Sequence, residues 1–348
     1  MAMSLYPFLF KPNLHPVVWG GNRLRPYKGL APSDEPIGES WEVSVVPGST
    51  SIISNGELVG RALDEVIESD PENILGKSVS ERYGGRLPLL VKFIDATRDL
   101  SIQVHPNDEM AQREHGKMGK SEMWYVIKAD AGSHLYAGFR QHITPYEYQH
   151  RVADGTITEV LADHPVKAGD VFYLPAGRVH AICGGILLAE VQQSSDVTYR
   201  IYDYNRPGMD GKPRELHTEL AAKALDYHVE RNYRTEYAES HNRAIQIIDS
   251  PYFDVRVMQV TAPFHRNLLK YDSFIISMCI EGDCKIRVRS TGTEIVLREG
   301  NSTLVPAAIA DYDVTPLNGK TLFLDAFIDN MDRSIAGKLT RFLHISSE

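Results

Sequence analysis

Short apolar segments separated by turn residues dominate the hydrophobic pattern of this 348-residue chain. The segments are bounded by Gly, Pro, Asn or Asp, which is typical of β-strands. Many short strands with frequent turns predict an all-β fold of the sandwich or barrel type rather than alternating strands and helices. The clearest predicted strands are Leu89–Ile94, Met123–Ile127, Val171–Leu174, Ile186–Val191, Phe274–Ile280 and Thr321–Ile328.

Helices are predicted at only a few places. Thr144-Pro145-Tyr146-Glu147 has the form of a capping box with proline at the first helical position, so a helix is expected to begin there. Apolar spacing predicts two further helices, Glu215–Leu225 and Asp332–Leu343.

An internal repeat organises the chain. Residues 167–180 can be laid over residues 298–311, and each copy then reaches an apolar strand, Ile186–Val191 or Thr321–Ala326. Upstream, Ser121–Trp124 matches Ser273–Ile276 more loosely. Within the repeat the aligned pairs include Gly169 with Gly300, Asp170 with Asn301, Pro175 with Pro306, and His180 with Asp311. Two copies of one β unit are therefore expected.

The repeat predicts two domains. Residues 1–235 would form a metal-binding domain with N-terminal strands and helical segments, and residues 236–348 a second β domain without metal ligands. The polar, weakly patterned region 231–249 is the predicted connector.

Charge and cysteine content narrow the class of protein. With 37 basic and 46 acidic residues the formal charge is −9. The sequence has no basic stripe of the kind that nucleic-acid-binding proteins carry, so we expect no nucleic-acid partner. A local cluster of Lys and Arg could still bind an anionic substrate. The 3 cysteines form no CxxC pair, and an odd number argues against a disulfide framework.

The apolar stretch near the N-terminus, Leu5–Phe10, is short, contains Pro7 and is closed by Lys11. It is too short and interrupted for a signal peptide or a membrane span. We therefore expect a cytoplasmic protein with no membrane partner.

Candidate metal ligands lie on three predicted strands. Side chains alternate along a strand, so Gln103 and His105 point to the same face. Glu122 heads a second strand, and His180 follows the turn Leu174–Gly177. Two imidazoles and a carboxylate suit a divalent transition metal, zinc foremost, with Gln103 as a fourth oxygen ligand.

The turn before His180 strengthens this interpretation. Its pattern, Gly-Asp-x3-Leu-Pro-Ala-Gly-x2-His, has the form of the second cupin motif, in which a tight hairpin directs the histidine inward. Taken singly, His105 and His180 could be half-buried histidines and Glu122 a surface acid. Motif and repeat together predict an all-β double cupin, two jelly-roll β-barrels with a few short helices.

Further charged residues accompany the predicted ligands. Glu190 interrupts an apolar strand, where a carboxylate costs desolvation free energy unless it is paired or used. Asp196 and Arg200 follow it, and a structural salt bridge from Arg200 to either acid is an alternative. Lys92 either snorkels or faces a polar pocket, and Lys120 shares the face of Glu122 if that strand begins early enough.

At these residues the sequence resembles the type I phosphomannose isomerases, in the compact form that lacks a large helical insertion. The resemblance covers nearly the whole chain. It includes Trp19-Gly20-Gly21, Gly38-Glu-Ser-Trp-Glu42, Leu90–Asp95, Gln103-Val-His-Pro106, Gly119-Lys-Ser-Glu122, Leu174–His180 and Glu190-x5-Asp196-x3-Arg200.

The resemblance implies one zinc ion per chain, held by Gln103, His105, Glu122 and His180. It implies interconversion of mannose 6-phosphate and fructose 6-phosphate, for which we expect a cis-enediol intermediate. We expect the chain to be a monomer or homodimer. Glu190 is the expected base, with Asp196 in reserve, Lys120 assisting proton transfer and Arg200 binding phosphate or enediolate. The expected substrate contacts are Trp19, Lys92, Lys120 and Arg200.

The sequence departs from the family pattern at one residue, and three alternative functions are open. Longer members carry a histidine where this chain has Gly119, so a proton-transfer role for that histidine cannot be transferred. The alternatives are a cupin isomerase of another, unphosphorylated sugar, a non-catalytic sugar-binding cupin, and a metal-dependent oxygenase. The cations Lys92, Lys120 and Arg200 favour a phosphorylated substrate.

Overall fold

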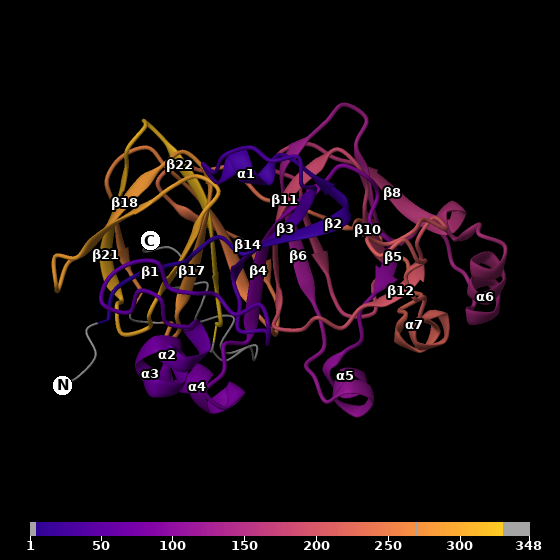
Figure 1. The fold of residues 1–348 in the computed structure, drawn as a ribbon, viewed down its shortest axis with the longest axis horizontal. Coiled ribbons are helices and arrows are strands. Elements are labelled where there is room, and N and C mark those ends of the chain that lie inside the picture. Colours follow the sequence, from indigo (N-terminus) through magenta and orange to yellow (C-terminus); the bar gives the residue numbers. More distant parts are fainter. Residues whose placement is uncertain (1–4, 269–270, 330–348) are drawn as a thin grey trace. The chain divides into compact units, whose positions relative to one another are not determined.

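The computed structural model describes residues 5–268 and 271–329. The described chain is mostly β-strand with few helices, in several antiparallel sheets, which confirms the coarse prediction (Figure 1). It divides into two compact units. The central unit contains Pro12–Ser51 and Pro88–Glu236, and the terminal unit contains the residues before Pro12, Ile52–Leu87, and the chain from Tyr237 onward.

The central unit is built from two antiparallel sheets. The 7-stranded sheet has the order β13 (Arg234–Thr235), β9 (Val171–Leu174), β6 (Glu122–Ala129), β11 (Ile186–Gln193), β4 (Leu89–Ala96), β2 (Leu14–Gly21) and β3 (Ile37–Val43). The 5-stranded sheet has the order β12 (Tyr199–Tyr202), β5 (Ile102–Val104), β10 (His180–Ile182), β7 (His134–Phe139) and β8 (Leu161–Pro165). A buried apolar cluster joins the two sheets, with Trp124 and Leu188 from one and Leu135 and Ile182 from the other.

The terminal unit repeats this plan. Its 6-stranded sheet has the order β1 (Phe8–Leu9), β20 (Ser302–Val305), β17 (Ile275–Glu281), β22 (Thr321–Phe327), β15 (Asp254–Val260) and β14 (Ala244–Asp249). Its 4-stranded sheet has the order β16 (Phe264–Asn267), β21 (Asp311–Pro316), β18 (Cys284–Val288) and β19 (Glu294–Leu297). A second apolar cluster packs between these sheets, including Met258, Cys279 and Ile286.

The helices are short. In the described residues they are α1 (Leu24–Tyr27), α2 (Leu63–Ser69), α3 (Pro71–Leu75), α4 (Lys77–Tyr83), α5 (Asp108–His115), α6 (Pro145–Ala153), a 3-10 turn (Ile157–Val160) and α7 (Thr218–Ala224). The Thr144 hydroxyl accepts a hydrogen bond from the Glu147 N–H, which confirms the predicted helix start at Pro145. The helix predicted from Glu215 begins at Thr218, and the one predicted over Asp332–Leu343 lies outside the described residues.

The internal repeat is visible in the strand boundaries. The aligned residues Val171 and Ser302 begin β9 and β20, and the aligned residues His180 and Asp311 begin β10 and β21. Each turn uses a glycine with positive φ, 88° at Gly169 and 70° at Gly300. The two segments therefore fold as copies of one supersecondary unit.

Strand registers correct two sequence predictions. In the central unit Glu122 lies opposite Leu174. Val305 is aligned with Leu174 in the repeat, and it lies opposite Ile275. The counterpart of Glu122 is thus Ile275, one residue beyond the predicted Phe274. The predicted connector 231–249 also contains β14, which pairs with β15 and buries Ile247 and Ile248. The division between the units, after Glu236, falls inside that region.

None of the helices in the described chain is long and apolar enough to span a membrane. The three cysteines, Cys183, Cys279 and Cys284, are buried and free, as their number and spacing predicted.

Candidate metal centre and active site

The end of one strand and the beginnings of two others bring the predicted ligands together in the central unit. Glu122 is the first residue of β6, and His180 is the first residue of β10. Gln103 lies directly opposite His180 in the register of β5 and β10, and His105 follows β5 on the same face as Gln103. Ligands separated by up to 77 residues in sequence therefore meet between the two sheets.

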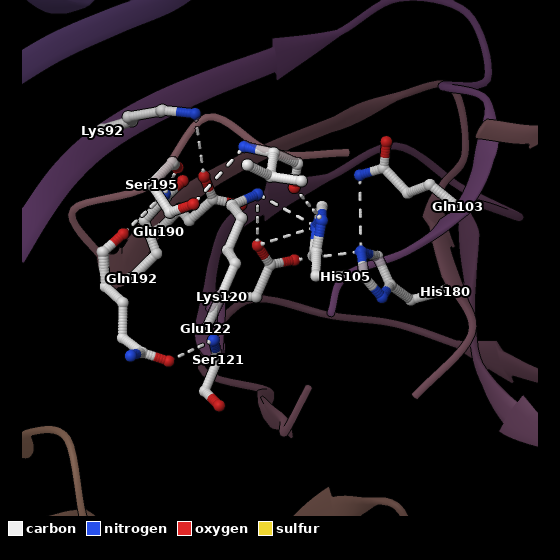
Figure 2. Close-up of polar contacts among 12 residues, drawn as sticks. Lys92, Gln103, His105, Lys120, Ser121, Glu122, His180, Glu190, Gln192 and Ser195 are labelled. Atoms are coloured by element: carbon white, nitrogen blue, oxygen red, sulfur yellow. Dashed lines mark hydrogen bonds and ion pairs between the residues drawn. The ribbon is translucent and has the colours of Figure 1, made fainter. Parts of the chain in front are cut away.

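Figure 2 shows His105 and His180 directed at the carboxylate of Glu122. His105 Nε2 lies 3.4 Å from Glu122 Oε2, and His180 Nε2 lies 3.1 Å from Glu122 Oε1. The three side chains are at most 1% exposed. In the described part of the chain they form the one group of three or more His, Cys, Asp or Glu residues able to hold a metal ion.

Hydrogen bonds to backbone carbonyls fix the histidine tautomers. His105 Nδ1 lies 2.9 Å from the Val197 carbonyl oxygen, and His180 Nδ1 lies 2.8 Å from that of Arg178. Since a carbonyl oxygen only accepts, each Nδ1 carries the proton and donates it. Each Nε2 therefore presents a lone pair toward Glu122, which is the orientation of a metal-ligating histidine.

The electrostatics of this group fit a bound cation. Burial and the nearby Lys120 ammonium lower the pKa of His105 to about 3, so its imidazole is neutral. Although burial opposes ionisation, the Lys120 ammonium holds the pKa of Glu122 well below its ordinary value. Glu122 Oε2 is paired with the Lys120 ammonium at 2.7 Å, whereas the buried Oε1 faces His180 Nε2 at 3.1 Å and accepts no hydrogen bond. Two lone pairs and a carboxylate facing one another need a positive charge between them, so these residues fit a divalent metal.

Gln103 presents the nitrogen of its amide to this group. Its Nε2 lies 3.3 Å from His180 Nε2, and a ligand role requires the amide to turn so that Oε1 faces the metal. The role of Gln103 as a fourth ligand stays a prediction.

Lys120 reaches the group without belonging to the strand. β6 begins at Glu122, so the condition for a shared strand face is not met. The side chain nevertheless places Nζ 2.7 Å from Glu122 Oε2 and 3.0 Å from His105 Nε2. Lys120 is 5% exposed. Its ammonium is therefore the nearest positive charge to the candidate ligands that the described residues supply.

A second charged cluster lies on the same sheet face. Glu190 is opposite both Lys92 and Trp124 in the strand registers, so the three side chains share one face. Lys92 Nζ lies 3.3 Å from Glu190 Oε1, and the Trp124 indole donates a 2.9 Å hydrogen bond to Glu190 Oε2. Lys92 therefore lies in a buried cluster of polar side chains and does not snorkel to the surface.

Sequence reasoning missed two residues of this cluster, Glu39 and Trp41. Lys92 Nζ lies 3.6 Å from Glu39 Oε2 and 4.9 Å from the centre of the Trp41 ring, and the Trp41 indole donates to Glu39. Burial opposes the charge on Lys92, but Glu39 and Glu190 raise the pKa of its ammonium above the ordinary value. The alternation of side chains along β3 could have indicated both residues, since positions 39 and 41 share one face of that strand.

Arg200 and Asp196 do not contact each other. Arg200 lies opposite Gln103 in the register of β12 and β5, and its Nη1 donates to the Glu215 carbonyl at 2.8 Å. Asp196 pairs at the surface with Lys117, at 2.6 Å. The alternative of a salt bridge from Arg200 to Glu190 or Asp196 is therefore wrong, because each acid has a lysine partner.

Two further sequence predictions concern Trp19 and Gly119. Trp19 is 3% exposed within the apolar core, which leaves it little surface for a substrate, and its substrate contact stays a prediction. Gly119 packs on the backbone after His105, and a Cβ there would lie 2.5 Å from Asn107 C and Asp108 N. This backbone has no room for a histidine at residue 119.

Comparisons with known proteins identify relatives of the chain. The family model "Phosphomannose isomerase type I, catalytic domain" matches residues 8–129. The chain is 34% identical over 308 residues to a mannose-6-phosphate isomerase of Streptococcus mutans, covering 88% of this chain and 94% of that protein. It is 33% identical over 313 residues to a mannose-6-phosphate isomerase of Bacillus subtilis, covering 89% and 96%.

A solved structure gives the same picture. The crystal structure of a mannose 6-phosphate isomerase from Bacillus subtilis matches with a TM-score of 0.83 and 30% sequence identity, over 92% of this chain and 99% of that one. The chain thus shares its fold and nearly its full length with these proteins.

Proposed function

The chain belongs to the type I phosphomannose isomerase family, and on this premise we propose that it interconverts mannose 6-phosphate and fructose 6-phosphate. The observation that carries the proposal is the buried His105–Glu122–His180 group beside the Glu190–Lys92 pair. A relative's activity is informative here because the chain covers 94% and 96% of two isomerases named for this reaction.

We further propose that the group holds one zinc ion, with Gln103 as the fourth ligand. Two neutral imidazoles and a carboxylate are ligands that zinc accepts. When bound, zinc would supply a Lewis acid for the sugar oxygens, worth several kcal/mol of charge stabilisation.

The reaction moves one proton between adjacent carbons. A base takes the proton from C2 of the aldose while the carbonyl oxygen at C1 gains a proton, which gives a cis-enediol. Return of a proton to C1 and loss of the hydroxyl proton at O2 then give the ketose, with no net change in composition. A carboxylate base and a nearby acid are sufficient for both steps.

We assign the base to Glu190, with Asp196 in reserve. Glu190 is 3% exposed and held by Lys92 and Trp124 on the face that also carries Glu122, since Gln192 and Glu122 lie opposite each other. Asp196 is a weaker candidate because its side chain is 42% exposed and paired with Lys117.

Three cationic side chains assist proton transfer or bind the substrate in the proposed reaction. Lys120, in contact with His105 and Glu122, is assigned to proton transfer at the sugar oxygens. Arg200 is assigned to the phosphate or enediolate, because its fork geometry matches an oxyanion and it shares the inner face with Gln103 and His180. Lys92 is the further substrate contact.

We also propose that each unit is a cupin, so that the chain is a double cupin. Two antiparallel sheets with a buried apolar cluster between them in each unit, and the repeated turn before β10 and β21, support this assignment. Every proposed ligand lies within residues 1–235 and none within 236–348, and we keep that functional division. In the structure, Ile52–Leu87 groups with the later residues.

A coupled assay of mannose 6-phosphate isomerisation tests the proposal. We expect turnover that is lost with chelator and restored by zinc, and no comparable turnover of unphosphorylated mannose. Equal turnover of free mannose would identify an isomerase of another substrate class. Absence of turnover in the zinc-loaded protein would refute the proposed function.

A further inference from the structure

Lys120 lies in a segment that no sheet fixes. β6 begins at Glu122, so residues 119–121 precede the strand, yet Lys120 must place its ammonium against Glu122 and His105. A lysine side chain has about 2 kcal/mol of rotamer entropy to lose, so its backbone must be held firmly for such a contact to persist.

Each of the three N–H groups in this segment has a specific acceptor. The Lys120 N–H donates to the Pro106 carbonyl at 3.0 Å. The other two acceptors are side chains: the Ser121 N–H donates to Gln193 Oε1 at 2.8 Å, and the Gly119 N–H donates to Asp108 Oδ1 at 2.8 Å. The segment therefore depends on two side chains distant in sequence.

The two side chains also bind each other. Gln193 Nε2 donates to Asp108 Oδ1 at 3.0 Å, which closes a ring of hydrogen bonds around the segment. Gln193 is 1% exposed at the end of β11, and its own N–H donates to the Ser121 carbonyl at 3.1 Å. The Gln193 amide accepts from Ser121 through its oxygen and donates to Asp108 through its nitrogen at the same time.

We propose that Gln193 and Asp108 are positioning residues, which act through the backbone of residues 119–121 to hold Lys120 in place for proton transfer. The close packing of Gly119 on residues 106–108 makes the coupling rigid, because the segment lies directly against the chain that carries His105. Neither side chain touches the candidate ligands, so their effect passes through Lys120. This inference rests on the proposed function.

The test compares Gln193→Met with the wild-type holoenzyme. Methionine keeps the length of the side chain but loses both hydrogen bonds, so Lys120 shifts. We expect kcat to fall between about 10-fold and 100-fold, as for a displacement on the order of 1 Å. KM and zinc content stay within about twofold, because phosphate and metal are bound by other residues. The matched control is Gln246→Met, which removes a Gln–Asp hydrogen bond in the terminal unit and leaves kcat unchanged.

A double variant separates positioning from a general structural role. If Gln193 acts through Lys120, then Lys120→Met and Lys120→Met/Gln193→Met have the same residual kcat. Independent losses that multiply, or a Gln193→Met enzyme with wild-type kcat, would overturn the inference. An inactive wild type would instead refute the proposed function.

A second pair of variants covers the case in which Gln193→Met fails to fold. Asp108→Asn retains the Oδ1 acceptor, so we expect wild-type kcat. Asp108→Ala loses it, and we expect the kcat of Gln193→Met. Equal kcat values for the two Asp108 variants would overturn the inference on their own.

Discussion

Glu190 and Asp325 occupy the same register position in the two units. Glu190 lies opposite Lys92 and Trp124, and Asp325 lies opposite Arg256 and Ser277, in sheets with matching strand order. Asp325 is fully buried and bound by Arg266 and the Ser277 hydroxyl. The repeat thus kept a buried carboxylate in both units.

The candidate metal ligands, in contrast, differ between the two units. The register counterparts of Gln103, Glu122 and His180 are Asn267, Ile275 and Asp311. Isoleucine stands where the central unit has the Glu122 carboxylate, and aspartate where it has the His180 imidazole, so the terminal unit lacks this ligand set at these three positions.

Loss of a metal-ligating histidine should release the metal. We expect His105→Ala and His180→Ala each to lower zinc affinity by more than the roughly 10–100-fold typical of second-shell changes, because a direct ligand is removed. Metal analysis after dialysis measures the occupancy, and circular dichroism controls for folding. Full occupancy in both variants would refute the ligand set.

Replacement of the proposed base should affect turnover rather than folding. Glu190→Gln is expected to lower kcat by about 10²–10⁴-fold, the range for a positioned general base. Asp196→Asn, at an exposed residue, is the comparison. Wild-type kcat in Glu190→Gln together with a loss in Asp196→Asn would move the assignment to Asp196.

Removal of the Lys92 charge should destabilise the central unit. Lys92 is 7% exposed between Glu39 and Glu190, and Lys92→Met leaves two carboxylates without their shared partner. We expect the free energy of unfolding to fall by about 3–5 kcal/mol, as measured by urea denaturation. Lys128→Met, at an exposed lysine, should change it by less than about 0.5 kcal/mol. A similar small change in Lys92→Met would contradict the buried pairing.

The metal-free protein should lose stability as the pH falls. Burial and Lys120 lower the pKa of His105 to about 3, whereas an unfolded histidine titrates near 6.5. Between these values the unfolded state binds more protons, so the free energy of unfolding falls with falling pH, by up to about 1.4 kcal/mol per pH unit. Denaturation of chelator-treated wild type and His105→Gln between pH 5 and 6.5 measures this slope. Identical slopes would exclude His105 as the source.

A side chain at residue 119 should not be tolerated. The Cβ of Gly119→Ala would lie 2.5 Å from backbone atoms of Asn107 and Asp108, which cannot move without shifting His105. We expect a loss of about 1–3 kcal/mol in stability and reduced turnover. Lys117→Ala, at an exposed neighbour, serves as control. Wild-type stability in Gly119→Ala would show that the segment is looser than described.

The sequence predicted those parts of the fold that depend on local apolar pattern. β4, β6, β9 and β11 are strands because their buried residues run almost without interruption. Motif and spacing also predicted that His105, Glu122 and His180 come together as candidate metal ligands. Residues that act through long-range partners were missed. Glu39 meets Lys92, and Gln193 meets Ser121, only because separate strands align in register, and nothing local in the sequence specifies that register.

The strand β1 has a consequence for how the chain is made. Phe8 and Leu9 pair with Leu304 and Thr303 of β20, and the Thr303 hydroxyl donates to the Phe8 carbonyl. The strand to which β1 pairs is therefore synthesised almost three hundred residues after β1 itself. Expression of a fragment ending at Glu236 would leave β1 without its partner strand, whereas the strands that carry the candidate ligands would already be complete.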